Sequence, residues 1–331
     1  MTGPRRQVRA LIVAPTRELA VQINEVITSL GQNTRIKSTM LFGGVSINPQ
    51  IQVLRKGVEV VVACPGRLLD HINRKTIDLS AVEMLVLDEA DQMFDMGFLP
   101  DIRKIVKALP RKRQTLLFSA TMPDEIRQLA SKILYKPANV EVGRVAPPQT
   151  IKHAVYPVAQ HQKTDFLLKL FSQIEVDSSL IFTRTKHRAK RLAERLENEG
   201  FPVVSLQGNL SQGRRTRAME GFKSGKYKFL VATDIAARGI DISTISHVIN
   251  FDVPSTAETY THRIGRTGRA ARSGEAFTFV TAADARIVKA IEKLIGNPLD
   301  RLKLADFIYE EEKAGTTARS ASTTGRRKSN S

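Results

Sequence analysis

Short apolar runs alternate with segments of helical periodicity along most of this chain. In the first part, the runs are rich in apolar and β-branched residues and cover positions 10–14, 38–42, 59–63, 84–87 and 115–118. The segment 16–30 between the first two runs repeats apolar residues at the spacing of one helix face. Apolar strands separated by helices are typical of a parallel sheet that is covered on both faces.

The alternation stops at residues 136–150, which contain three prolines and are typical of a linker. It then restarts, with strands expected at 179–182, 203–206, 229–232, 247–250 and 276–280 and helices expected at 186–199 and 212–222. The chain of 331 residues is therefore expected to form two tandem α/β units. The predicted divisions are a first domain at 1–143, a linker at 144–150, a second domain at 151–309 and a tail at 310–331.

The tail is expected to be disordered because residues 313–331 contain small, polar and basic residues with no apolar period. A loose contact with a polyanion and a simple solubilising extension are equally good interpretations of this segment.

Charge and cysteine content narrow the class of protein. The formal net charge is +18, which favours a polyanionic partner because each Lys or Arg that neutralises a phosphate releases a counterion. The single Cys64 cannot form an internal disulfide, so a reducing compartment fits. No apolar run approaches the length of a membrane span, and we expect a cytoplasmic protein.

Paired carboxylates directly follow the apolar run 84–87. Residues 88–91 read Asp-Glu-Ala-Asp. In nucleotide hydrolysis, one such carboxylate holds Mg²⁺ through water and the next orients the attacking water. Asp88 is the candidate for the metal and Glu89 for the water; a solvated acidic strand end is the alternative.

An arginine-rich segment, His262–Arg269, is the second candidate for phosphate chemistry. Phosphoryl transfer needs positive charge near the γ-phosphate, and an arginine there contributes about 10³–10⁵ in rate. The arginines at 263, 266 and 269 are three residues apart, so on a helical turn they would share a face. A solvated basic helix is the alternative, but glycines at 265 and 268 disfavour it.

Taken together, these motifs resemble those of the DEAD-box RNA helicases of superfamily 2, in particular the bacterial members. The resemblance extends from about residue 9 to about residue 307. Besides 88–91 and 262–269, it includes Pro-Thr-Arg-Glu-Leu-Ala at 15–20, Gly-Gly at 43–44, Pro-Gly-Arg at 65–67, Ser-Ala-Thr at 119–121, Gln-Gly-Asn at 207–209 and the segment 232–241.

The resemblance implies two tandem RecA-like domains that close on ATP, Mg²⁺ and single-stranded RNA and open short duplexes locally. Asp88 and Glu89 keep the roles given above. Arg266 and Arg269 would reach the γ-phosphate from the second domain, and Asp241 would bind the ribose.

Three further residues would couple hydrolysis to strand separation. They are Ser119 and Thr121, through hydrogen bonds to the acidic motif and to His262, and His262 itself. The positions implied to line the RNA backbone are Thr16, Arg17, Gly44, Arg67, Arg184, Gly208, Thr233 and Arg238. Such contacts position RNA without reading its sequence. Aromatic residues make up 6% of the chain and Trp is absent, which argues against base stacking as the main grip.

The sequence departs from its family because no segment reads G-x-x-x-x-G-K-[ST], the phosphate-binding loop, and the adenine-reading motif is also missing. We expect a first domain that is incomplete at its N-terminus and loosely folded, beside an intact second domain, and no measurable RNA-stimulated ATPase from this chain as given. Cys64 stands where the family has Thr and is expected to act as a small buried hydrophobe.

Three functions remain open at this stage. They are an ATP-dependent RNA helicase in truncated form, a non-hydrolysing RNA-binding fragment and a DNA translocase of the same superfamily. The motifs match the RNA group better than the DNA group, so we predict the RNA helicase by family and motif content, and the non-hydrolysing fragment as the behaviour of the isolated chain.

Overall fold

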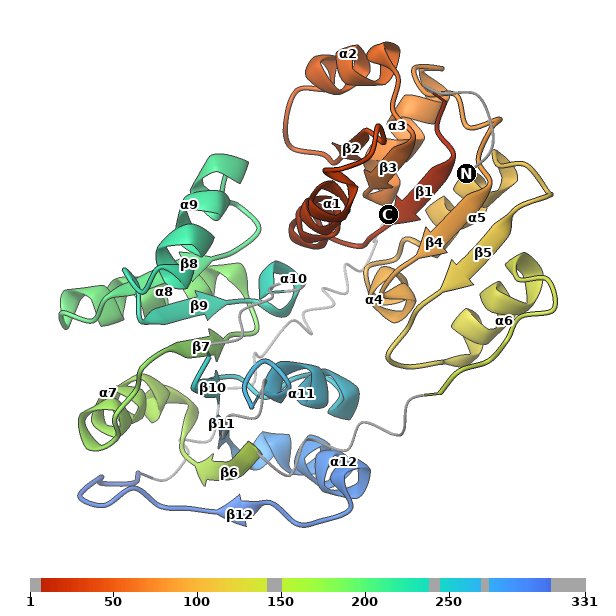
Figure 1. Cartoon of the computed structure of the whole chain (residues 1–331). Helices are drawn as coiled ribbons and strands as arrows, with labels where there is room; N and C mark the ends of the chain where they lie inside the picture. Colours follow the sequence, from red (N-terminus) through yellow and green to blue (C-terminus); the bar gives the residue numbers. More distant parts are fainter. Residues whose placement is uncertain (1–6, 142–150, 238–244, 269–273, 311–331) are drawn as a thin grey trace, which may run out of the picture.

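The computed structural model describes residues 7–141, 151–237, 245–268 and 274–310, which form two α/β domains (Figure 1). The first domain contains a parallel sheet in the order β2-β3-β1-β4-β5. Its strands are β1 (Ala10–Val13), β2 (Ser38–Leu41), β3 (Val60–Ala63), β4 (Met84–Leu87) and β5 (Gln114–Leu117). Its helices are α1 (Arg17–Gly31), α2 (Asn48–Lys56), α3 (Pro65–Asn73), α4 (Ala90–Asp95), α5 (Leu99–Lys107) and α6 (Asp124–Ile133).

The second domain contains a larger parallel sheet in the order β12-β6-β11-β10-β7-β9-β8. Its strands are β6 (Ile151–Pro157), β7 (Ser179–Phe182), β8 (Val203–Leu206), β9 (Phe229–Ala232), β10 (His247–Asn250), β11 (Gly274–Val280) and β12 (Asp300–Arg301). Its helices are α7 (Lys163–Gln173), α8 (Lys186–Asn198), α9 (Gln212–Lys223), α10 (Asp234–Ala237), α11 (Ala257–Ile264) and α12 (Ala285–Ile295), with 3₁₀ turns η1 (Gln160–Gln162) and η2 (Ala282–Asp284).

Side-chain caps fix the start of several helices at the carboxyl ends of strands. The Thr16 hydroxyl accepts a hydrogen bond from Leu19 N (3.3 Å) and thereby begins α1 directly after β1. Thr185 caps α8 after β7 in the same way, by accepting from Arg188 N (3.2 Å). These caps place the residues that follow each strand at one edge of its sheet.

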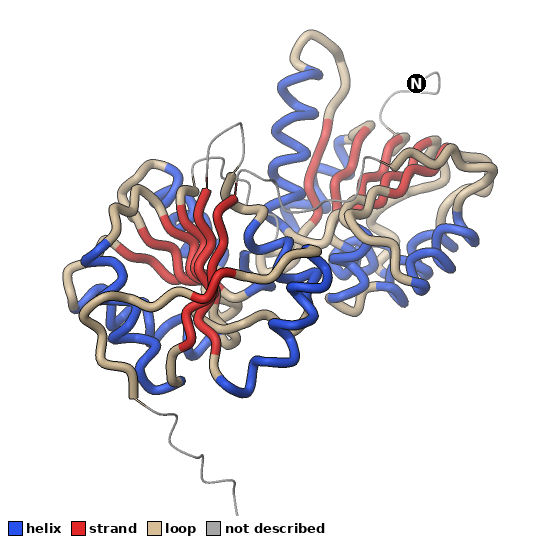
Figure 2. Tube along the Cα trace, turned by 90° about the horizontal axis from the view of Figure 1, so that it is seen from below, coloured by secondary structure: helices blue, strands red, loops and turns tan. Residues whose placement is uncertain are grey.

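The sheet of the first domain is covered unequally. One face packs against α2 to α6 in a cluster that includes fully buried Leu11, Val61 and Leu85. Among the described residues, the opposite face packs chiefly against α1, which contacts β2 and β3. Met84 and Leu116 on β4 and β5 are only half-buried. Figure 2 shows the helices and strands of the two domains from below. The expected cover on both faces is wrong for this part of the sheet, because no described helix lies over it.

The strands expected from apolar runs occur within one or two residues of their observed positions, and the fold class of two tandem RecA-like parallel-sheet domains is confirmed. The sequence pattern did not identify β6 or the short β12. The division at 1–143, 144–150 and 151–309 stays a prediction, and the predicted linker and most of the tail lie outside the described residues. None of the described helices is both long and apolar enough to cross a membrane.

Candidate active site between the two domains

The acidic motif lies at the carboxyl end of β4, where the chain turns sharply into α4. Glu89 adopts a left-handed conformation (φ 48°), and its N–H donates to Asp88 Oδ1 at 2.9 Å. This geometry separates the two neighbouring carboxylates into different environments. Burial raises the pKa of Asp88, and the nearby charge of Asp91 adds to the shift.

The loop after β5 is bonded to the acidic motif through Asp91, which is 5% exposed. Ser119 Oγ accepts from Asp91 N (3.1 Å) and donates to Thr121 O (2.6 Å). Thr121 donates to Asp91 Oδ2 from both its N (3.0 Å) and its Oγ1 (3.1 Å). A shift of the Ser-Ala-Thr loop must therefore move the acidic turn as well. Hydrogen bonds from Ser119 and Thr121 to the acidic motif were expected from the family resemblance, but the central part of Asp91 in them was not.

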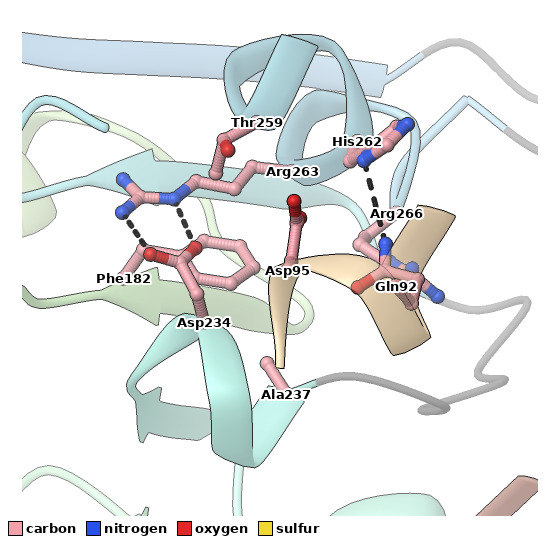
Figure 3. A pocket seen from close by; sticks show the side chains of 9 residues that line it. All are labelled: Gln92, Asp95, Phe182, Asp234, Ala237, Thr259, His262, Arg263 and Arg266. Carbon is pink, nitrogen blue, oxygen red and sulfur yellow. Dashed lines mark hydrogen bonds and ion pairs between the residues drawn. The ribbon is translucent and has the colours of Figure 1, made fainter. Parts of the chain in front are cut away.

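Arg263 and Arg266 do not share one helical face, so that expectation is wrong for these two residues; Arg269 lies outside the described residues. The helix α11 ends at Ile264, and Gly265 follows as its C-cap. Arg263, on the helix, is 3% exposed and forms a two-pronged bond to Asp234, with Nε–Oδ1 at 2.6 Å and Nη2–Oδ2 at 2.8 Å (Figure 3). Arg266 lies beyond the helix end and lines a pocket between the domains.

Arg263 is a structural residue that sequence reasoning missed. Its Nη1 also donates to Asn250 Oδ1 (3.0 Å) and to Asp252 O (2.7 Å), and its guanidinium lies 4.8 Å from the Phe182 ring centroid. These contacts tie α11 to β7, β10 and α10. They fix the position from which Arg266 extends.

The two motifs meet across the domain boundary. Gln92, on α4, lies 3.4 Å from His262 Nδ1 on α11. Figure 3 shows Gln92 and Asp95 from the first domain facing His262 and Arg266 from the second. His262 was expected to partner Ser119 or Thr121, but its observed bond goes to Gln92. The only signal for Gln92 was its place one residue after the acidic motif.

Arg17 and Gly44 lie against each other on the first domain. Gly44 has φ +74°, and a Cβ on it would lie 2.4 Å from the Arg17 guanidinium. Only glycine fits this close approach without displacing Arg17. Arg67 lies near the same loop and donates to Val45 O at 2.9 Å. Thr16, by contrast, is 7% exposed and acts as the cap of α1.

The same surface joins the second domain directly. Arg17 Nη1 donates to Gln212 Oε1 at 2.7 Å. Next to it, Glu18 Oε1 accepts from Arg215 Nη2 (2.7 Å) and Nε (2.9 Å), and both side chains are mostly buried. The start of α1 and the start of α9 therefore carry cross-domain contacts beside the predicted RNA path.

The predicted RNA-lining residues of the second domain lie at strand ends. Arg184 follows β7, is exposed, and donates from its backbone N to Asp252 Oδ2 at 2.8 Å. Gly208 is exposed after β8. Thr233 lies directly before α10, and its O accepts from the N of Ala237, the last residue of that helix. Three predicted site residues lie outside the described residues: Arg238, Asp241 and Arg269.

Cys64 caps the start of α3 without a side-chain hydrogen bond. Burial raises the pKa of its thiol to about 12, so the group is neutral at physiological pH. This agrees with a small apolar role.

The donors at the acidic motif suit a magnesium ion that is held mainly by water and phosphate oxygens. Among the described residues, no three His, Cys, Asp or Glu side chains come together as a metal-binding group. Mg²⁺ commonly uses one or two carboxylates, several waters and substrate phosphates, rather than an all-protein cage. The carboxylates of Asp88 and Glu89 fit that requirement.

The comparisons identify the family. Residues 3–129 match the DEAD/DEAH box helicase family and residues 162–271 match the helicase conserved C-terminal domain. The chain is 43% identical over 297 residues to the DEAD-box ATP-dependent RNA helicase CshA of Bacillus subtilis. The matched region covers 89% of this chain and 60% of that protein. This chain belongs to the DEAD-box helicase family. It spans about 60% of the length of this curated relative.

Solved structures bear on the domain arrangement. Saccharomyces cerevisiae Dbp5 bound to RNA and ADP BeF₃ is 36% identical, with a TM-score of 0.79 over 90% of this chain and 78% of that chain. A DEAD box protein from the hyperthermophile Methanococcus jannaschii is 38% identical, with a TM-score of 0.51 over 90% of this chain and 80% of that chain. The two solved structures have nearly the same sequence identity to this chain and cover nearly the same share of it. The higher TM-score of the Dbp5 complex therefore indicates that the two domains here are placed as in that complex.

Proposed function

We propose that this chain is the catalytic core region of an ATP-dependent RNA helicase that binds single-stranded RNA and opens short duplexes locally. The observation that carries the proposal is the contact between Gln92 and His262. It brings the acidic motif of the first domain and the arginine segment of the second to the two sides of one pocket. An ATPase site that forms only when two domains close is how the family couples nucleotide to RNA.

The roles of the site residues follow from their positions. Asp88 would hold Mg²⁺ through water, and Glu89 would orient the attacking water. Arg266 would offset negative charge on the γ-phosphate from the opposite domain, and Arg269 would do the same. Bound ATP with Mg²⁺ would supply the phosphoryl group and its charge neutralisation. Asp241 would hydrogen-bond the ribose.

Coupling would run through the bonds around the acidic turn. Ser119 and Thr121 hold Asp91, so a movement of their loop is transmitted to Glu89 two residues earlier. His262 contacts Gln92 on α4, the helix that follows the acidic motif, so it would move with that motif. Opening of the domains would break that contact and leave the arginines out of reach.

RNA would bind along the carboxyl ends of both sheets. The proposed contacts are Thr16, Arg17, Gly44, Arg67, Arg184, Gly208, Thr233 and Arg238. Arginines and backbone N–H groups suit phosphates and carry no base preference. The domain placement shared with RNA-bound Dbp5 supports an RNA-competent arrangement. A net charge of +18 supports a salt-sensitive grip.

These 331 residues contain no phosphate-binding loop, which supports a second candidate for the chain as given: a non-hydrolysing RNA-binding fragment. Backbone N–H groups and the loop lysine normally hold the β- and γ-phosphates. A cytoplasmic location is also proposed, supported by the single cysteine.

The experiment that tests the proposal measures steady-state ATP hydrolysis and RNA affinity on the purified chain. We expect salt-sensitive binding of single-stranded RNA and no RNA-stimulated ATP turnover. Fluorescence anisotropy of a labelled RNA at rising salt and a phosphate-release assay provide the two readings, with Glu89→Gln as the matched variant.

The outcomes separate the two candidates. Turnover that RNA stimulates and Glu89→Gln abolishes would show that a catalytic site forms without the loop and would remove the fragment interpretation. Absence of RNA binding would remove both. Equal affinity for single-stranded RNA and for single-stranded DNA of the same sequence would favour a DNA translocase instead.

A further inference from the structure

A cavity of about 610 Å³ lies at the outer end of the second sheet. Its apolar floor comes from β6, β11 and α12, including Val155, Val158, Val280 and Val288. In Figure 1 these elements lie at the bottom of the molecule, near β12 and away from the first domain. The volume is within the range of about 300–1,000 Å³ that is usual for binding pockets. This cavity contains none of the residues assigned to ATP or RNA.

The wall formed by residues 302–310 is tied to the domain at several points. Gln162 Nε2 donates to Ile308 O (2.8 Å), and Gln162 Oε1 accepts from Glu310 N (3.0 Å). The Tyr309 hydroxyl accepts from Leu304 N at 2.7 Å. Phe307 packs against Phe166 with ring centroids 5.0 Å apart. The cavity is therefore a built feature rather than a gap under a loose strand.

Positive charge surrounds the opening. Lys289 on α12, Arg301 on β12 and Lys303 line the cavity, and all three are exposed. Two acids near the rim are already paired: Glu310 bonds to His161 at 2.8 Å, and Glu292 lies 3.8 Å from Arg301. The rim thus has excess positive charge around an apolar floor, which suits an occupant that combines apolar side chains with carboxylates.

Two occupants within reach fit this chemistry poorly. The segment that continues the chain, 311–331, carries five Lys and Arg against two Glu, and its largest aliphatic side chain is that of Ala. It matches neither the charge of the rim nor the floor. A strand added to β6 beyond β12 would meet Pro157, which has no N–H to donate. Side-chain insertion is therefore favoured over sheet extension.

We propose that this cavity is a docking site for a partner protein, and that it takes a short segment in which one or two large apolar side chains are flanked by Asp or Glu. The apolar side chains fill the floor between α12 and β6. The flanking carboxylates pair with Lys289 and Lys303, whereas Arg301 is paired with Glu292. The site lies apart from the ATP and RNA residues, so a bound partner leaves the cleft free.

The test is a selection of short random peptides displayed on phage against the full 331-residue chain, followed by fluorescence anisotropy with the selected peptides. Ala285→Trp fills the cavity from an exposed position at the start of α12, and Lys289→Glu reverses the charge of its rim. Arg286→Glu, on the same helix and exposed but not lining the cavity, is the matched control. Circular dichroism checks that each variant folds.

We expect selected peptides rich in acidic and large apolar residues, with affinity lost in Ala285→Trp and lowered at least about tenfold in Lys289→Glu. Arg286→Glu should change affinity less than about twofold. Selected peptides that lack acids, equal losses in the two charge reversals, or no selected peptide at all would each overturn the proposal. Displacement of a selected peptide by a synthetic 311–331 peptide would assign the site to the chain's own continuation instead. The readout is peptide binding, so it does not depend on the proposed helicase activity.

Discussion

Lys163 is among the most deeply buried ionisable side chains described in the molecule. It is 1% exposed and donates from Nζ to Phe251 O (3.1 Å) and Phe279 O (2.9 Å) at the ends of β10 and β11. Burial lowers its pKa to about 8, against an ordinary value of about 10.4. Two carbonyl acceptors do not replace the water that a full ammonium charge loses, so the charged form is penalised in the fold.

This residue predicts that the stability of the second domain rises with pH. Between about pH 8 and about pH 10.4 the unfolded chain binds the Lys163 proton and the folded chain does not, so the free energy of unfolding increases across that window by up to about 3 kcal/mol. Below pH 8, Lys163 is protonated in the folded chain, so its burial lowers the free energy of unfolding by the full amount. Urea unfolding followed by circular dichroism at pH 8, 9 and 10 measures the change.

The comparison with Lys163→Met isolates this contribution. The raised pKa of Cys64 acts in the opposite direction, because its unfolded thiol ionises first. That contribution is common to both proteins and cancels in the difference. The variant should lose the rise, whereas Lys152→Met, at an exposed site on β6, should keep it. An equal pH slope in all three proteins would show that Lys163 is solvated in the fold.

At the scale of elements, the start of β11 holds the arginine segment in place. Gly274 packs so closely on residues 267–268 that a Cβ would lie 2.3 Å from Thr267 Oγ1 and 2.5 Å from Gly268 N. Thr267 is 1% exposed and donates to Ile245 O at 2.6 Å. The turn that carries Arg266 is therefore held against the sheet. The buried hydroxyl of Thr267 bonds it to Ile245 O, and the lack of a side chain on Gly274 lets the two segments pack closely.

Gly274→Ala should therefore displace the turn that carries Arg266. The nearest atoms include backbone, which cannot rotate away, so we expect a loss of about 1–3 kcal/mol in stability. Amide hydrogen exchange should accelerate at residues 265–268. Gly213→Ala is the control, because its Cβ meets nothing within 4 Å on helix α9 and alanine favours helix by up to about 1 kcal/mol. Unchanged exchange at 265–268 would contradict the role given to Gly274.

The edge of the first domain's sheet at β5 is a second feature at the scale of elements. Among the described strands, β5 is hydrogen-bonded only to β4, and Phe118 just beyond β5 is 52% exposed. The prediction of a loosely folded first domain rests on this edge and stays a prediction. The core around Leu11 and Leu85, both fully buried, is nevertheless closed on the other face.

At the scale of the whole molecule, the two domains are joined by polar contacts between the start of α1 and the start of α9. Glu18 and Arg215 are separated by 197 positions in sequence and are 14% and 12% exposed. Removing one partner of a pair this buried costs more than breaking an exposed pair, because the remaining charge is left desolvated and unpaired. The pair lies beside Arg17 and Gln212, so it favours the arrangement in which the two proposed RNA-binding surfaces are aligned.

Reversing one charge of this pair should separate the domains. We expect Glu18→Arg alone, or Arg215→Glu alone, to lower the affinity for single-stranded RNA about tenfold and to increase the radius of gyration in solution scattering. The double reversal should recover most of the affinity. Reversal of Lys190 and Glu194, an exposed pair within α8, should change neither quantity. Additive losses in the double variant would mean that the two residues do not act as a pair.

The sequence by itself determined the local features. Apolar runs placed most strands within one or two residues, and polar motifs at their ends placed Asp88, Ser119 and Thr121 at one sheet edge, because parallel strands present their carboxyl ends together. Motif spacing also gave the family. These are properties of neighbouring residues, so a linear pattern contains them.

Only the tertiary structure decided which side chains meet. Arg263 and Arg266 look equivalent in sequence, but the end of α11 turns one into the core toward Asp234 and leaves the other at the pocket. The contact of Gln92 with His262 joins residues 170 positions apart, and no local period predicts it. Such contacts depend on how two separately folded sheets are placed against each other, which is set by packing across the domain boundary.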